Sequence, residues 1–336
     1  MAGKSTSGQP IWLRRFRNVP VKVDQALARL EESRLRRGKV VPHVKDRLTI
    51  QAPIEAPLGA IEKNCENREF FLADMFDLPL KCDGHSLQAP IFSLSTKPDR
   101  NVWEWRSKDE KSYIKVVPSV LGRATQHDKD ILIFVISQLV EGRNRGRADA
   151  RNRTVRFRAY DLLVTTNRQI SGDGYRRLRE ALERLSCTKI MTNIQSGGQR
   201  FREGFGLIDR WRIVEQSAND TRMVAIEITL SEWLFSAVRS LEVLTLDPAY
   251  FELRSPLTRR LYEIARKHCG YKGQWSIGLE LLRGRAGSHS QLRDFRRQLR
   301  AIQAENGLPG YRLELGEKDR VTFFNLSKNR LGHEAP

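Results

Sequence analysis

The sequence predicts an α+β protein built from two tandem winged-helix domains, preceded by a basic, partly disordered N-terminal arm. Three observations lead to this prediction. The chain of 336 residues has room for two domains and an additional segment. The same order of helices and strands occurs twice along it. In each half, one helix combines an apolar stripe with an arginine-rich face, which is typical of a DNA-reading helix.

The N-terminal region differs in composition from the rest of the chain. It is rich in Lys and Arg, contains scattered Gly and Pro, and shows one helical pattern, at residues 24–37. A basic arm and an ordinary solvated tail both fit this composition. We expect five segments: a basic flexible arm at 1–47, an extended lead-in at 48–90, a first winged-helix domain at 91–245, a second at 246–326, and a tail at 327–336.

Charge and hydrophobicity limit the class of protein. With 40% hydrophobic residues the chain can bury a core, and its formal charge of +19 favours a polyanionic partner, most commonly nucleic acid. The longest apolar run, residues 131–140, is too short to span a bilayer, so we expect a buried helix and no membrane partner. The N-terminus lacks a signal-peptide core, and four cysteines suit a reducing compartment, which predicts a cytoplasmic protein.

Hydrophobic periodicity and turn residues predict the elements of the first half. After a hairpin at residues 102–117, a helix from residue 125 to 141 should end at Gly142, with Thr125 or Asp128 as its cap. The expected elements that follow are a strand at 154–158, a short helix at 159–166, a helix opening at 171, two strands separated by SGGQ, the second of them continuous over 204–215, a strand at 223–230 and a helix at 231–239.

The second half repeats this order. A helix at 256–268 precedes a short strand at 275–277, a short helix at 278–282, a long helix at 290–305, and strands at 311–315 and 321–324 joined by a GEKD turn. Helix, strand, helix, turn, helix and a final hairpin is the order of a winged helix.

The two long helices carry matching apolar stripes. The apolar residues are spaced 3, 4 and 3 apart, and the second set lies 117 residues after the first: Tyr175, Leu178, Leu182 and Leu185; then Leu292, Phe295, Leu299 and Ile302. This spacing places each set on one helix face, which should pack against a core. The arginines between them should therefore point outward.

Two outward arginine faces, each followed by a hairpin with basic flanks, predict contact with duplex DNA. The predicted DNA-binding residues are Arg176, Arg177, Arg179, Arg184, Arg200 and Arg202 in the first domain, and Ser288, His289, Gln291, Arg293, Arg296, Arg297, Arg300, Lys318 and Arg320 in the second. A solvated basic face is the alternative for either helix alone. Because Glu180 and Glu183 repel phosphate, the second domain should be the principal DNA reader.

Nucleotide, metal and catalytic motifs are incomplete. The SGDG at residues 171–174 lacks the third glycine of a dinucleotide fingerprint, and the GKS at residues 3–5 lacks the upstream glycine of a P-loop. Cys82 and His85 form one close pair without a second pair to complete a zinc site. We therefore expect no metal, no cofactor and no enzymatic activity. A nickase or primase would need metal-binding residues that the sequence does not supply.

Several segments resemble the replication initiator protein A family of plasmids: IFSLSTKPD, PSVLGRATQHDKDILIFVISQL, TVRFRAYDLLVTTNR, GYRRLREALERL, EGFGLIDRWRIV, LTLDPAYFELRSPLTRRLYEIARKHCG and WSIGLELL. The resemblance covers residues 91–324. It implies binding to repeated origin elements (iterons), duplex opening, association with the host helicase and host initiator, and a homodimer in equilibrium with monomer. In that equilibrium the first domain forms the dimer interface, and the dimer represses its own gene. Such a protein would work in the bacterial cytoplasm at a plasmid or nucleoid.

Related initiators also contact the host sliding clamp through a short Gln-x-x-Leu-Phe segment. Gln88, Ile91 and Phe92 occupy matching positions in QAPIF, although the Ala-Pro centre departs from the pattern and a core-packing role is the alternative. A winged-helix transcriptional regulator without initiator activity is the alternative function, because base contacts look alike in both classes.

Overall fold

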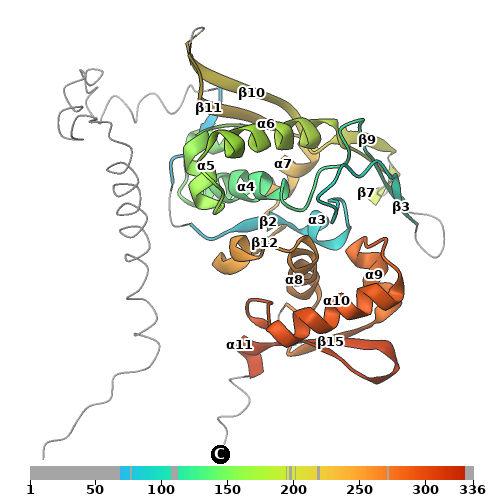
Figure 1. The fold of residues 1–336 in the computed structure, drawn as a ribbon. Helices are drawn as coiled ribbons and strands as arrows, with labels where there is room; N and C mark the ends of the chain where they lie inside the picture. Colours follow the sequence, from blue (N-terminus) through green and yellow to red (C-terminus); the bar gives the residue numbers. More distant parts are fainter. Residues whose placement is uncertain are drawn as a thin grey trace, which may run out of the picture. The chain divides into compact units, whose positions relative to one another are not determined.

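The computed structural model of the protein describes residues 69–75, 78–106, 113–193, 195–196, 199–200, 202–217, 220–270 and 272–329. The predicted arm at 1–47, the lead-in before residue 69 and the tail after residue 329 lie outside these residues. All the described residues belong to one compact unit, Glu62–Pro336. They form a mixed helix and sheet fold (Figure 1). No helix among them is long and apolar enough to cross a membrane.

The described part of the lead-in is structured. Its elements are β1 (Phe71–Leu72), β2 (Lys81–Asp83) and α3 (Gly84–Gln88). β1 pairs in parallel with a strand of the first module, and Leu80, Cys82 and Leu87 are buried in the core of the second. Here "first module" means the described residues of 91–245, and "second module" means those of 246–329, which include the first three residues of the predicted tail.

The first module combines helices with two separate four-stranded sheets. Its elements are β3 (Trp103–Arg106), β4 (Tyr113–Val117), α4 (Lys129–Asn144), η3 (Ala148–Arg151), β5 (Thr154–Arg158), α5 (Ala159–Thr165), α6 (Gly172–Cys187), β6 (Lys189–Thr192), β7 (Gln195–Ser196), β8 (Gln199–Arg200), β9 (Glu203–Gly206), β10 (Ile208–Ser217), β11 (Asp220–Leu230), α7 (Glu232–Arg239) and β12 (Val243–Thr245). The sheets have the orders β1-β5-β11-β10 and β3-β4-β6-β9.

The second module follows the predicted order closely. Its elements are η4 (Pro248–Glu252), α8 (Pro256–His268), β13 (Gln274–Gly278), α9 (Leu279–Ala286), α10 (Leu292–Glu305), β14 (Tyr311–Leu315), η5 (Glu317–Asp319), β15 (Arg320–Asn325) and α11 (Leu326–Asn329). Its three strands form one antiparallel sheet in the order β13-β15-β14. Figure 1 shows α10 beside β15 in this part of the chain.

The two apolar stripes face cores, as predicted. Leu178, Leu182 and Leu185 are fully buried in the first core, and Phe295 and Leu299 are fully buried in the second. The first residue of each stripe packs against the edge of its core and is partly buried. The 3.6-residue period of a helix therefore places the arginines between the stripes on the opposite face.

Two boundaries differ from the predictions. α4 does not stop at Gly142 but continues to Asn144. Gly142 instead makes room for the ring of Phe71, since a Cβ there would lie 2.5 Å from that ring. Asp128 precedes α4 without a side-chain capping bond. The expected continuous strand over residues 204–215 is divided at buried Leu207 into β9 and β10, which belong to different sheets.

The predicted repeat holds for the helices but not for the sheets. In the second module, β13 pairs with the final strand of the hairpin. Its counterpart in the first module, β5, pairs instead with β11 and β1, while the β6–β9 hairpin continues into β4 and β3. The described strands of the first module therefore form two four-stranded sheets, besides the two-stranded pairs β7-β8 and β12-β2, where the second module has one three-stranded sheet.

A buried ionic network joins the two modules. Glu263 of α8 lies 2.9 Å from Nζ of Lys129 on α4 and 3.1 Å from Nη1 of Arg260, and its Oε1 also accepts a 2.8 Å hydrogen bond from the hydroxyl of Tyr250. The charged side chains are at most 1% exposed. Burial beside Glu263 holds the pKa of Tyr250 well above its usual value, so this hydroxyl stays a donor. The network fixes α8 against α4.

Gly174 provides the first prediction. Replacing it with alanine is expected to lower the free energy of unfolding by about 1–3 kcal/mol, because the new Cβ would lie 1.9 Å from the carbonyl oxygen of Gln169. Thermal and urea unfolding measure the effect. Gly172→Ala is the matched control: it lies in the same helical turn, its Cβ would meet nothing within 4 Å, and alanine is the better helix former. Equal stability of the two variants would contradict the close packing at Gln169.

Candidate nucleic-acid interface

The turn between α9 and α10 positions the start of the second predicted reading helix. Gly287 ends α9 with φ of 71°, and a Cβ there would lie 2.7 Å from Pro90, so the turn requires glycine. Arg283 closes the turn by donating to the backbone oxygen of Ser290 at 2.8 Å. His289 and Gln291 are exposed on this turn, and Ser288 is half-buried, with its hydroxyl 2.8 Å from that of Ser290.

The outer face of α10 carries four arginines, of which two are ion-paired with described residues and two are not. Arg293 and Arg300 are exposed and make no ion pair with a described residue. Arg297 is exposed and lies 3.1 Å from Asp294 on its own helix. Arg296 is half-buried. These arginines are therefore not equivalent: Arg293 and Arg300 offer all their guanidinium donors to a ligand.

Arg296 connects α10 to the hairpin turn. Its Nε and Nη2 donate to the two carboxylate oxygens of Asp319 at 3.1 and 2.7 Å. Lys318 and Asp319 both have left-handed backbone conformations, with φ of 55° and 54°. This bidentate pair holds the turn beside the helix and leaves Lys318 and Arg320 exposed. Arg296 was predicted as an outward DNA contact, but in the free protein its guanidinium binds the turn.

The arginine face of α6 is largely compensated by its own acidic neighbours. Arg176 pairs with both Asp173 and Glu180, and Arg177 lies 2.7 Å from Asp173. Both arginines are exposed. The hydrogen bond that Arg176 donates to Asp173 raises the pKa of Arg176. Arg179 is exposed and has no ion pair within the described part of the chain.

Arg184 does not point freely outward, in contrast to the prediction. Its Nε and Nη2 donate to the carboxylate of Asp128 at 2.8 and 2.9 Å, and the side chain is 21% exposed. This hydrogen bond raises the pKa of Arg184. The helix period put Arg184 between apolar positions correctly, but the loop before α4 covers that side. In this structure Arg184 therefore forms a pair with the loop before α4.

The hairpin of the first module projects from β6 and β9. β7 pairs with β8 at its tip, and Arg200 is the last residue of β8, although the side chain of Arg200 lies outside what the structure describes. Arg202, just before β9, is exposed. The predicted contacts therefore lie on α6, on α10 with the turn before it, and on the two hairpins.

The segment that resembles a clamp-binding motif is buried. Ile91 and Phe92 are each 2% exposed and belong to the first core, and Nζ of Lys129 lies 5.3 Å from the Phe92 ring. Gln88 ends α3, and its side chain is not among the described ones. Core packing, the alternative role of this segment, accounts for Ile91 and Phe92, and a clamp contact would require them to leave the core.

Metal-binding groups do not gather in the described residues, where no cluster of three His, Cys, Asp or Glu side chains occurs. Cys82 is buried, and desolvation raises its pKa to about 12, so its thiol is protonated at neutral pH. The side chain of its predicted neighbour His85 is not described.

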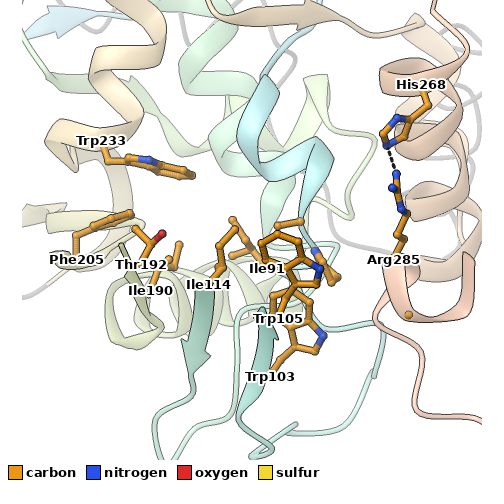
Figure 2. A pocket seen from close by; sticks show the side chains of 13 residues that line it. Ile91, Trp103, Trp105, Ile114, Ile190, Thr192, Phe205, Trp233, His268 and Arg285 are labelled. Carbon is orange, nitrogen blue, oxygen red and sulfur yellow. Dashed lines mark hydrogen bonds between the residues drawn. The ribbon is translucent and has the colours of Figure 1, made fainter. Parts of the chain in front are cut away.

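An aromatic pocket of about 250 Å³ lies on one face of the β3-β4-β6-β9 sheet and was not predicted. Figure 2 shows Trp233 facing Phe205 on one side of it, and Ile91, Trp103 and Trp105 on another. At its rim, Nη1 of Arg285 lies 2.8 Å from Nε2 of His268, and burial together with this cation lowers the pKa of His268 to about 4. The alternation in VWEWR was the sequence signal for this pocket, because it places Trp103 and Trp105 on the same face of β3.

Comparisons with known proteins agree on one family. A family model described as "Replication initiator protein A" matches residues 81–313. A protein of Wigglesworthia glossinidia brevipalpis that is named as a replication protein is 36% identical over 267 residues, which are 78% of this chain and 95% of the relative.

Solved structures of RctB share the fold at low sequence identity. A structure of its domains 2 and 3 gives a TM-score of 0.54 at 13% identity, covering 72% of this chain and 98% of that one. A second structure of the same domains gives a TM-score of 0.50 at 13% identity, covering 74% and 99%. These structures are similar in fold to the described part of this chain.

Proposed function

The chain belongs to the replication initiator protein A family, and we propose that it starts replication by binding duplex DNA with two winged-helix modules. One observation carries the proposal: α10 follows α9 by a tight turn, lies beside a hairpin and presents Arg293 and Arg300 without acidic partners in the described chain. Guanidinium groups on a helix of this kind can pair with guanine in the major groove.

The winged-helix interpretation has different support in the two modules. In the second, α8, α9 and α10 accompany the three-stranded sheet β13-β15-β14, the arrangement expected for that fold. In the first, α4, α5, α6 and the β6–β9 hairpin occur in the same order, although β5 pairs elsewhere. We assign the principal DNA contact to the second module, since Arg176 and Arg177 pair with acidic residues of α6 itself and Arg184 pairs with Asp128.

Origin binding of this kind would proceed without catalysis by the protein itself. Two reading helices on one chain suit a long site, such as the repeated elements of a plasmid origin, and distortion of that DNA would promote opening of an A/T-rich tract. We further propose that the protein forms a dimer through its first module, represses its own gene as a dimer, and associates with host helicase and host initiator in the bacterial cytoplasm.

Footprinting tests the proposed function directly. The purified full chain, added to the DNA that flanks its own gene, is expected to protect tandem repeats, and permanganate is expected to modify an adjacent A/T-rich tract. A lone protected palindrome without permanganate reactivity would instead identify a transcriptional regulator. Absence of any protected site would contradict DNA binding.

A further inference from the structure

Two hollows flank the segment at residues 95–98. The first, of about 820 Å³, is lined on one side by Arg176 and Arg177 of α6. The second, of about 490 Å³, is lined by His289 in the turn before α10 and by Gln298 in the middle of α10. Residues 95 and 98 line both hollows. A DNA strand in contact with both helices would therefore cross this segment.

Two free cations lie at this crossing. Lys97 is exposed on the segment, and Arg254 is exposed just before α8; both line the first hollow. Neither makes an ion pair with any residue that the structure describes. Most other cations of that hollow are already neutralised, as Arg184 is by Asp128. Lys97 and Arg254 are thus the lining cations that remain available to an anionic ligand.

Hydrogen bonds to Asp99, the residue after this segment, hold the segment in place. Asp99 accepts hydrogen bonds from the Ser93 hydroxyl at 2.7 Å and from Nη2 of Arg123 at 2.9 Å. Arg123 is 1% exposed and also lines the first hollow, and its Nε and Nη1 are buried without a hydrogen-bond partner. A buried guanidinium with unmade donors favours an anionic oxygen nearby. The segment therefore presents Lys97 from a fixed position, next to an ion-paired arginine that still has two unmade donors.

We propose that Lys97, in the segment at residues 95–98, and Arg254, just before α8, bind the DNA backbone phosphates that lie between α6 and α10. This site rests on the proposed function, since it assumes that both helices contact one duplex. It reads no bases. Its role is to hold the backbone between the two reading helices, which fixes their separation along the DNA.

Salt-dependent binding of the full chain tests this site. Each of Lys97→Ala and Arg254→Ala is expected to reduce the slope of log affinity against log salt by about 0.9, and to weaken specific and nonspecific duplexes equally, by roughly fivefold at physiological salt. Arg151→Ala is the matched control, because Arg151 is exposed, lines neither hollow and makes no ion pair in the described part. It should leave the slope unchanged.

The outcomes separate the site from the proposed function. If the wild type binds duplex and both variants keep its slope, the site is wrong while the proposed function stands. If the wild type binds no duplex, the proposed function fails. Free nucleoside triphosphate is the other source of phosphate: thermal stabilisation of the wild type by ATP that both substitutions abolish, with an unchanged DNA slope, would overturn the assignment to the DNA backbone.

Discussion

Glu263→Ala is expected to lower the free energy of unfolding by about 3–5 kcal/mol, as measured by urea denaturation. The carboxylate is fully buried and lies within 2.9–3.1 Å of the cations of Lys129 and Arg260. Its removal leaves two buried positive charges without their partner and the Tyr250 hydroxyl without its acceptor. Since Lys129 belongs to α4 and Glu263 to α8, both modules should lose stability together.

A surface ion pair provides the control for this prediction. Glu232 and Arg239 of α7 pair with side chains that are 62% and 51% exposed. Solvent and salt screen such a pair, so Glu232→Ala should cost less than about 1 kcal/mol. Glu263→Gln keeps the volume and the hydrogen-bond acceptor but removes the charge, and it should fall between the two. A loss below 1 kcal/mol for Glu263→Ala would show that water reaches the network.

Replacing both Arg293 and Arg300 with alanine is expected to cost about 1–3 kcal/mol of specific DNA binding for each side chain that reads a base. Both arginines are exposed on α10 and have no ionic partner among the described residues, so neither must break a pair to reach the DNA. Gel-shift titration against the protected repeat, at fixed salt, measures the effect. The unfolding midpoint should not change, because neither side chain packs in the core.

Two further arginines complete this test. Arg179→Ala removes the free exposed cation of α6 and should have a smaller effect, if the second module is the principal reader. Arg239→Ala on α7, outside the predicted contacts, should have none. Arg296 is a poor probe, since its loss also releases the hairpin turn at Asp319. Unchanged affinity of the Arg293 and Arg300 double variant would exclude α10 as a reading helix.

Local sequence pattern was sufficient for most elements of the second module. The helix predicted at 256–268 has those bounds, and the predicted strand at 311–315 does as well. Each rests on signals within a few residues, such as the serine cap and proline that open α8. The same local signals misjudged Gly142, because its role depends on the ring of Phe71, which is distant in sequence.

The sequence predicted which helix faces carry the arginines, but not which of those arginines are neutralised by carboxylates. Periodicity identified the outward arginines of both helices, yet Arg184 and Arg296 are paired with carboxylates on other elements. Lys97 and Arg254 were missed because they lie in loops without periodicity. Nothing in their local sequence indicates that the fold brings them to the same hollow.

The sequence by itself determined the helices, their buried stripes, the basic character of the chain and its family, because these depend on residue type and on spacing along one element. The tertiary structure alone decided that residues 204–215 divide between two sheets, that Glu263 neutralises Lys129, and which arginines remain free. The physical reason is that strand pairing and ion pairing join groups far apart in the chain, and their energies depend on the burial that folding creates.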